Sequence, residues 1–420
     1  MTSVGNIISA DSVQAYKGVN IGANKPSKEE LERVKHHLVD VVEPNGQSSA
    51  ASWREDAIEV IHDITKQNSK VKQNEENYNN EILPVVVGGT MMYLQWLVHG
   101  RPDAVKPTPE AIIKAEKVVE KYQFMEGNED GGWKMALEET YKLGKIFKER
   151  VDKLPGKDWY RLRRTLEVAY TIIDTENQSN LKLDELEKQQ EKLKNTFTGK
   201  RLDSLSDLGY DVRCFFLCPN DRMHHCTLVD ERCEKMLLQG LLKETTDLSI
   251  KGDLPLDGLP AKAIGYRQAL EYLTRDDAKN DDSVAFSEFL NVFTAATRQY
   301  SKKQMSWFRK DKEFMFIPVT LIGDEGTLSK PISKQDRVKK VVDHIIHMCS
   351  LSRDKYEREL CCSDSSHISV MARKMNTDQA KGMKVYQGKR YHLIEGGNAL
   401  INLMIEADQC TEIMKRELLS

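Results

Sequence analysis

The chain has 420 residues, 40% of them apolar and 30% charged, which is enough for two or three domains around a substantial core. A net charge of -3 excludes a global basic field of the kind that identifies a nucleic-acid binder by charge alone, so any such site must be a local patch. No apolar run is long enough for a membrane span, and the eight cysteines have no regular spacing, which favours a reducing compartment.

The N-terminal part of the sequence predicts a strand, a helix and a second strand. Residues 6–10 form an apolar run, and "SAASWREDAIEVIHDITKQ" has helical spacing, with Ser49 as a plausible cap. The polar segment 66–81 predicts an exposed loop. The run "ILPVVVGGT" that follows predicts a strand buried on both faces of a parallel sheet. This order is a βαβ unit.

Strand signals disappear between residues 102 and 208, which are charged and helical in pattern. They return in the predicted strand 211–218, followed by a helix over 224–246, a loop, the helix "FLNVFTAATRQYSKKQMSWFRK" and the strand "EFMFIPV". Beyond about Asp343 no motif can be interpreted. The pattern predicts one α/β domain interrupted by a helical insertion.

Two strand-end motifs are candidates for a ligand site. Asp11 follows the first strand and Gly88-Gly89-Thr90 follows the second, and open α/β folds bind ligands at the carboxyl edge of the sheet. A carboxylate there can accept a proton, bind Mg²⁺ through water or cap the next helix, and position alone leaves these alternatives open. Paired glycines let backbone approach a ligand closely, although a tight turn also needs them.

The helix around "ATRQYSKKQMSWFR" predicts a basic face. Arg298, Lys302 and Arg309 fall on one stripe, and aromatic residues that include Tyr300 and Trp307 fall on the opposite, core-facing stripe. This arrangement suits a helix that faces phosphates, and a merely solvated basic face is the alternative. The cluster "KDWYRLRR" is a second basic patch, so the two together suggest a clamp on a polyanion.

The segment "CPNDRMHHCTLVDERC" is rich in potential metal ligands. It pairs no C-x₂-C with an H-x₃₋₅-H, and its pattern is helical. We therefore expect no zinc site there, and "CCSDSSH" near the C-terminus gives no better candidate.

Eight segments in order resemble the tRNA dimethylallyltransferases, which prenylate N6 of the adenosine beside the anticodon (adenosine 37). They are "IISADSVQAYKGVNIGANKPS", "HHLVDVVEP", "SAASWREDA", "LPVVVGGTMMYLQWLVHG", "DWYRLRRTLEV", "ERCEKMLLQGL", "LPAKAIGYRQALEYL" and "ATRQYSKKQMSWFR", and "VHGRPDAVKPTPE" is most similar to the organellar-type branch of plants and algae. The resemblance implies a phosphate-loop NTPase-like parallel sheet flanked by helices. It divides the chain into a discontinuous catalytic core (1–101 and 209–341), a tRNA-binding insertion (102–208) and an extension of unknown role (342–420).

Position by position, the resemblance implies that Asp11 is the general base and that Arg232 holds the diphosphate of dimethylallyl diphosphate, with Mg²⁺ as cofactor. The implied partner is the anticodon stem-loop of tRNA, no membrane is involved, and we expect a monomer. With Thr90 added for its place at the sheet edge, the implied tRNA-binding set is Ser12, Val13, Gln14, Thr90, Tyr160, Arg161, Leu162, Arg163, Arg164, Lys262, Gly265, Tyr266, Arg267, Arg298, Gln299 and Lys302.

The sequence departs from the family at its start, where the family has a strand and a G-x-T-x-S-G-K-[ST] phosphate loop about twenty residues before the Asp-Ser turn. Only ten residues precede Asp11, so the first strand, the loop and its lysine are absent, and we expect these 420 residues to be inactive on their own. A truncated start is the favoured explanation. The compartment is expected to be cytoplasmic or organellar, because a targeting segment could be missing with the N-terminus. Ala23, Asn24 and Leu228 are smaller departures on the phosphate side.

Two alternatives to a tRNA prenyltransferase stay open. An adenylate isopentenyltransferase, which makes cytokinin from free nucleotide, shares the core, and the long insertion and basic helix argue against it. A tRNA-binding relic without catalysis is the non-enzymatic alternative.

Overall fold

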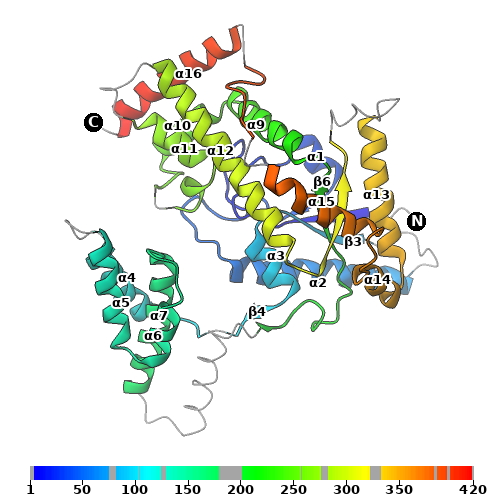
Figure 1. The fold of residues 1–420 in the computed structure, drawn as a ribbon, viewed down its shortest axis with the longest axis horizontal. Helices are drawn as coiled ribbons and strands as arrows, with labels where there is room; N and C mark the ends of the chain where they lie inside the picture. The colour runs from blue at the N-terminus through cyan, green and yellow to red at the C-terminus, as the bar shows by residue number, and fades with distance from the viewer. Residues whose placement is uncertain are drawn as a thin grey trace. The chain divides into compact units, whose positions relative to one another are not determined.

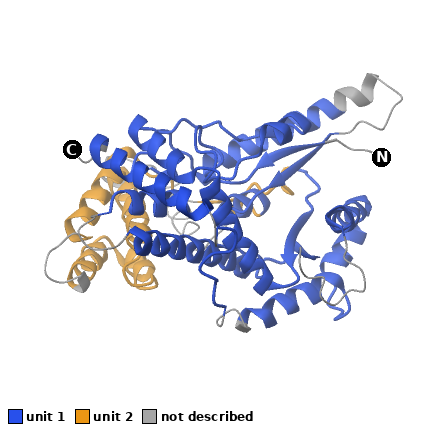
Figure 2. Ribbon diagram, turned by 90° about the horizontal axis from the view of Figure 1, so that it is seen from above, with its two compact units in different colours: residues 1–98, 209–420 blue, residues 99–208 orange. Residues whose placement is uncertain are grey.

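The computed structural model describes residues 4–74, 82–103, 105–123, 129–178, 201–256, 258–275, 282–321, 333–382, 386–394 and 398–418. The chain divides into two compact units, which Figure 2 distinguishes by colour. Unit 1 comprises residues 1–98 and 209–420, and unit 2 comprises residues 99–208. No helix within the described ranges is both long and apolar enough to cross a membrane.

Unit 1 alternates strands and helices before a run of helices at its C-terminal end (Figure 1). Its elements are β1 (Val4–Ser9), α1 (Lys28–Arg33), β2 (His36–His37), α2 (Ala50–Asn74), β3 (Ile82–Val87), α3 (Met91–Val98), β6 (Cys214–Pro219), α9 (Arg222–Leu238), α10 (Leu241–Lys251), η1 (Pro260–Lys262), α11 (Tyr266–Leu273), α12 (Asp282–Phe308), β7 (Phe314–Val319), α13 (Lys334–Ser350), α14 (Arg353–Leu360), α15 (Ile368–Gly382) and α16 (Asn398–Leu418).

The strands of unit 1 pair in parallel, as the sequence predicts. Strand β1 lies between β2 and β3, and β6 pairs with β7 in a second sheet. The expectation that β3 is buried on both faces is wrong, because Leu83 is 48% exposed and Val87 is 52% exposed. Among the described strands β3 pairs only with β1, so it stands at a sheet edge with alternate side chains open to solvent.

Two helix boundaries differ from the sequence prediction. Helix α2 begins after Ser49, whose hydroxyl accepts a hydrogen bond from the Ser52 amide (3.1 Å), which confirms the predicted cap. It continues to Asn74, so the predicted loop is helical as far as that residue, and the rest of the loop lies outside the described residues. The predicted helix 224–246 is interrupted at Gly240, whose φ of 95° ends α9 and begins α10.

The C-terminal helices belong to the core of unit 1. Helix α15 packs against β7, where the Ser369 hydroxyl accepts a hydrogen bond from the buried Phe316 amide (2.9 Å). Helix α16 packs against α10 and contributes Leu403 and Ala407 to the same apolar cluster as Leu237. The last helices therefore contribute to the folding of the core although they carry no recognisable motif.

Unit 2 is a small helical unit with a core of its own. Its elements are β4 (Arg101–Pro102), α4 (Pro109–Gln123), α5 (Glu129–Tyr141), α6 (Lys145–Val151), α7 (Trp159–Gln178) and β5 (Arg201–Leu202). Helices α4, α5 and α7 enclose Ala115, Trp133 and Leu166, and the rings of Trp133 and Trp159 meet edge to face at 5.0 Å. The charged stretch 181–201 predicted as helical lies almost wholly outside the described residues.

Candidate active site

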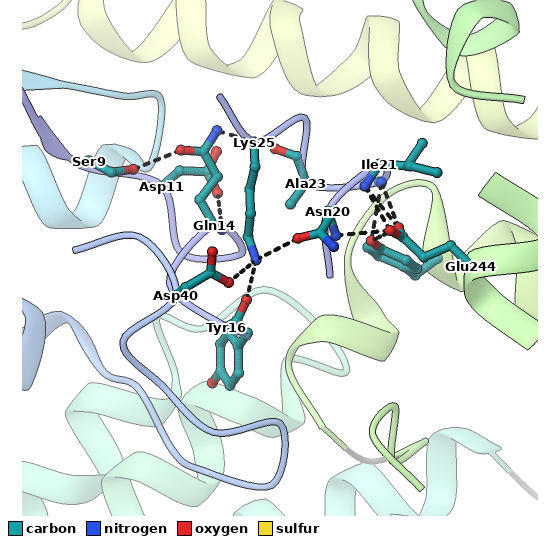
Figure 3. A network of polar contacts seen from close by, with 12 residues as sticks. Ser9, Asp11, Gln14, Tyr16, Asn20, Ile21, Ala23, Lys25, Asp40 and Glu244 are labelled. Carbon is teal, nitrogen blue, oxygen red and sulfur yellow. Dashed lines mark hydrogen bonds and ion pairs between the residues drawn. The ribbon is translucent and has the colours of Figure 1, made fainter. Parts of the chain in front are cut away.

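Asp11 lies in the turn that follows β1. Its Oδ1 accepts hydrogen bonds from the amides of Val13 (2.8 Å) and Gln14 (3.2 Å). This is the capping role that the sequence left open, although it caps a turn and not a helix. No hydrogen bond joins Oδ2 to another residue within the described ranges, so that oxygen is available to a ligand. Figure 3 shows the carboxylate above the turn.

The glycine turn after β3 is built against the Asp11 turn. The Thr90 amide donates to the carbonyl of Ala10 (3.1 Å), and the Ser12 amide donates to the Thr90 hydroxyl (3.0 Å). A Cβ on Gly88 would lie 2.4 Å from the Ala10 carbonyl carbon, so the close approach of the two turns requires glycine there. The structure thus brings Thr90 and Ser12 together with Asp11 at one sheet edge.

Helix α12 closes this turn from a second side. Tyr300 Oη (3.2 Å) and Gln304 Nε2 (2.8 Å) both donate to the carbonyl oxygen of Gly89. Burial, and secondarily the Asp11 carboxylate, raises the pKa of Tyr300, so its hydroxyl stays a proton donor. From the sequence, Tyr300 was predicted to lie on the core face, and Gln304 was not predicted as a site residue. The sequence feature that could have identified the pair is their spacing of four residues, which places them on one face of a helix.

Gln14 links the Asp11 turn to the loop 20–25. Its Oε1 accepts a hydrogen bond from the Ser9 hydroxyl (2.9 Å), and its Nε2 donates to the carbonyls of Ala23 (3.3 Å) and Asn24 (3.1 Å). Figure 3 shows this chain of contacts. With all three bonds made, the Gln14 side chain is committed to positioning the loop.

The loop 20–25 is anchored by two charged side chains. The carboxylate of Glu244, on α10, accepts hydrogen bonds from the amides of Ile21 (2.9 Å) and Asn20 (3.1 Å). Lys25 Nζ donates to the carbonyl of Tyr16 (2.6 Å) and pairs with Asp40 (2.5 Å) (Figure 3). The role of Glu244 was not predicted from the sequence, because its partners lie more than two hundred residues earlier in the chain.

Three residues of the predicted tRNA-binding set are buried. Tyr266 is 0% exposed and its hydroxyl donates to Glu244 (2.5 Å), and Leu162 is 0% exposed in the core of unit 2. Neither side chain can reach tRNA in this fold, so the prediction for these two is wrong. Gly265 is also buried, with a φ of 101° that allows it to begin α11.

Arg298 does not present a free cation on α12. Its guanidinium forms an ion pair with Asp230 on α9 and lies 5.4 Å from the centre of the Tyr386 ring. Because Asp230 is only 2% exposed, Arg298 serves first to neutralise a buried carboxylate. The prediction that Arg298 faces phosphate is therefore corrected, whereas Gln299 and Lys302 are exposed on the same helix.

The arginines of the predicted patch Tyr160–Arg164 are also paired. Arg161 contacts Asp158 (2.8 Å), while Arg163 and Arg164 both pair with the buried Glu167. The patch carries less free charge than its sequence suggests. Tyr160 itself is 67% exposed, so its ring is open to stack on a base.

The remaining predicted contacts lie on exposed surfaces of unit 1. Lys262 and Arg267 are exposed at either side of the start of α11. Arg232 is exposed on α9, and no hydrogen bond or ion pair joins it to another residue that the structure describes. Nothing in the described contacts links Arg232 to the Asp11 turn.

The cysteine-rich segment forms α9 and carries no described metal centre. Burial raises the pKa of the Cys226 and Cys233 thiols to about 11, which disfavours the thiolate that binds metals. Among the residues with described positions, no three His, Cys, Asp or Glu side chains are grouped to hold an ion.

Comparisons with known proteins place these residues in a family. The family model described as IPP transferase matches residues 14–311. The protein tRNA dimethylallyltransferase 9 of Arabidopsis thaliana is 34% identical over 331 residues, which are 74% of this chain and 65% of that relative.

The comparison with solved structures also gave matches. The tRNA isopentenylpyrophosphate transferase of Bacillus halodurans is 22% identical, with 84% of this chain and 91% of that chain covered and a TM-score of 0.49. A eukaryotic dimethylallyltransferase acting on tRNA is 18% identical, with 90% and 92% covered and a TM-score of 0.49. The chain spans 65% of the length of the Arabidopsis relative. The family model matches well over half of the chain, so the chain belongs to the IPP transferase family.

Proposed function

We propose that this protein transfers a dimethylallyl group from dimethylallyl diphosphate to N6 of adenosine 37 in tRNA. The observation that carries the proposal is the Asp11 carboxylate, at the carboxyl edge of β1 in a chain of the IPP transferase family. One of its oxygens is fixed by the turn while the other has no partner within the described residues. Such a carboxylate is held in place and can still accept a proton.

The proposed reaction is a displacement at C1 of dimethylallyl diphosphate. The N6 amine of adenine forms the new N–C bond as the C–O bond to diphosphate breaks, and the amine proton passes to Asp11 Oδ2. An aryl amine is a weak nucleophile, so a fixed base and a stabilised leaving group are both required. Arg232, exposed and unpaired among the described residues, is the side chain that we assign to the diphosphate.

The surroundings of Asp11 suit the adenine side of this reaction. The Thr90 hydroxyl is bound to the Ser12 amide next to Asp11, and the Tyr300 hydroxyl is bound to the neighbouring glycine turn and stays neutral because its pKa is raised. These groups can orient a base that has been flipped out of its stack, at a cost of a few kcal/mol.

We include Mg²⁺ in the proposal. Proteins commonly hold Mg²⁺ through one or two carboxylates together with substrate phosphates and water. Because Asp11 Oδ2 is assigned to the proton, Asp11 would contact such an ion only through water, and the ion would take most of its ligands from diphosphate and water. Bound there, the ion would neutralise charge that develops on the leaving group.

For tRNA recognition we assign the exposed members of the predicted set. Lys302, Lys262 and Arg267 supply positive charge on unit 1, and Tyr160 offers a ring for stacking on unit 2. The anticodon stem-loop is the part of tRNA that holds the target adenosine, and we propose it as the element bound.

Radiolabel transfer tests the proposed activity. Protein expressed from the complete gene is incubated with ¹⁴C-labelled dimethylallyl diphosphate, Mg²⁺ and tRNA, and label in the precipitated tRNA is counted. We expect label in tRNA and none in free adenosine monophosphate. Label in the free nucleotide alone would indicate an adenylate isopentenyltransferase instead. Label in neither tRNA nor free nucleotide would reject both activities.

A further inference from the structure

The segment 386–394, which lies beyond the residues matched by the family model, is bound to α9 through two buried carboxylates. We call this segment the clasp. Asp230 Oδ2 accepts a hydrogen bond from Tyr386 Oη (2.8 Å). One helical turn later, Glu234 accepts three backbone hydrogen bonds from the other end of the clasp.

Both carboxylate oxygens of Glu234 accept hydrogen bonds from the clasp. Its Oε1 accepts from the His392 amide (2.7 Å), and its Oε2 accepts from the amides of Leu393 (2.6 Å) and Ile394 (3.0 Å). Glu234 is 1% exposed, so water cannot replace these partners. Charge-assisted bonds of this kind are about twice as strong as neutral ones, and leaving the amides unpaired in a buried site is costly.

The contact with Asp230 is equally close. A Cβ on Gly388 would lie 3.1 Å from Asp230 Oδ2, so the clasp backbone passes directly against the carboxylate. Burial chiefly raises the pKa of Tyr386 to about 12, which keeps its hydroxyl a donor. On its other oxygen Asp230 holds Arg298 of α12. The clasp, α9 and α12 are thus joined at one buried charge.

Helix geometry relates these two carboxylates to Arg232. Residues 230 and 234 are four apart and share one face of α9, whereas residue 232 is two positions from each and lies about 200° around the helix. Accordingly Asp230 and Glu234 are buried and Arg232 is exposed. Any rotation of α9 that loosened the clasp would swing Arg232 by the same angle.

We propose that the clasp positions α9, so that Asp230 and Glu234 fix the direction in which Arg232 presents its guanidinium to a diphosphate. This deepens the proposed function and rests on it, because it takes the diphosphate group as the ligand of Arg232. Glu234, Asp230 and Tyr386 are positioning residues in this account.

Binding of inorganic diphosphate, measured by titration calorimetry on full-length protein from the complete gene, tests the proposal. Glu234→Gln places an NH₂ group against backbone N–H donors and should weaken diphosphate binding on the order of tenfold. Tyr386→Phe, the milder variant, should weaken it roughly threefold. Glu231→Gln is the matched control, since it removes the same charge from the same helix, and among the described residues the ion-pair partner of Glu231 is Lys235 (3.8 Å).

The double variant separates positioning from general destabilisation. Arg232→Ala should weaken binding, and adding Glu234→Gln to it should weaken binding no further, because the positioned group is gone. The proposal is overturned if wild-type protein binds no diphosphate, if both clasp variants bind like wild type, or if the two effects multiply. Label transfer to tRNA by the same preparations is read separately. If wild-type protein binds diphosphate through Arg232 but labels no tRNA, the proposed function is rejected and the proposed role of the clasp is retained.

Discussion

Asp11 has two carboxylate oxygens in different surroundings. Oδ1 is bound by two backbone amides, and Oδ2 has no hydrogen bond within the described residues. A single residue can therefore hold the turn and accept a proton. The sequence placed Asp11 at the right edge of the sheet and could not divide these roles, because the division depends on the turn geometry.

Asp11→Asn separates the two roles. The amide oxygen of Asn keeps the hydrogen bonds to the Val13 and Gln14 amides, but the side chain cannot take a proton at neutral pH. We expect kcat to fall by at least about a hundredfold with the melting temperature unchanged. Asp11→Ala should lose both kcat and stability. Steady-state turnover and thermal unfolding are the measurements, and an Asn variant with wild-type turnover would remove Asp11 as the base.

Arg298 and Lys302 stand one turn apart on α12 and are predicted to behave differently. Arg298→Ala leaves the buried Asp230 uncompensated and should lower the free energy of unfolding by about 3 kcal/mol. Lys302→Ala, at an exposed position, should change it by less than about 0.5 kcal/mol. The Lys302 variant should instead reduce the slope of log tRNA affinity against log salt by about 1.

Urea unfolding and filter binding across a salt series check these expectations. Equal losses of stability in the two variants would contradict the buried ion pair. An unchanged salt slope in the Lys302 variant would show that this part of α12 does not face phosphate.

Arg298 was predicted to face phosphate, and the structure pairs it with Asp230 instead. The sequence predicted its position on one face of a helix. Its partners Asp230 and Tyr386 could not be predicted, because they lie 68 residues earlier and 88 residues later in the chain. The spacing of cations along a helix does not show whether carboxylates from distant segments pair with them in the folded protein. The predictions that Leu162 and Tyr266 contact tRNA were wrong for a similar reason. A sequence motif does not show which of its residues face the core.

At the scale of elements, the glycine turn after β3 determines how β1, β3 and α12 meet. Gly88 lies against the Ala10 backbone, while a Cβ on Gly89 would lie 2.1 Å from Gln304 Nε2. Backbone cannot move aside without distorting the sheet, whereas the end of a glutamine side chain can. The two glycines are therefore not equivalent.

Gly88→Ala should destabilise the protein by about 3 kcal/mol, and Gly89→Ala by about 1 kcal/mol through the lost Gln304 hydrogen bond. Urea unfolding of both variants measures the difference. Gly156→Ala is the control, because apart from its chain neighbours no described residue has an atom within 4 Å of the added Cβ. Equal costs for Gly88 and Gly89 would contradict the packing described for this turn.

Local patterns predicted the elements better than their ends. The strand rhythm and the helical insertion follow from hydrophobic periodicity, and the parallel pairing follows from the βαβ order. The break at Gly240 had a signal, a glycine between two apolar runs. The exposure of β3 had none, because the number of neighbours a strand acquires is a property of the whole sheet.

At the level of the whole chain, segments with and without motifs pack together in unit 1. Helix α16 contributes to the apolar cluster of α9 to α12, and the clasp binds α9 through buried charge. The sequence could not assign this C-terminal region, since packing against a distant surface requires only apolar residues at helical spacing. Family membership rests on residues 14–311, so what lies beyond them had to come from the structure.

Mass spectrometry of tRNA nucleosides tests whether this protein prenylates tRNA in the cell. The gene is deleted in the source organism and restored either as wild type or with Asp11→Asn, and N6-isopentenyladenosine and its derivatives are quantified. We expect the deletion to abolish this nucleoside in at least one tRNA pool, the wild-type gene to restore it and the Asn variant to leave it absent. Unchanged nucleoside levels in every tRNA pool after deletion would contradict this expectation.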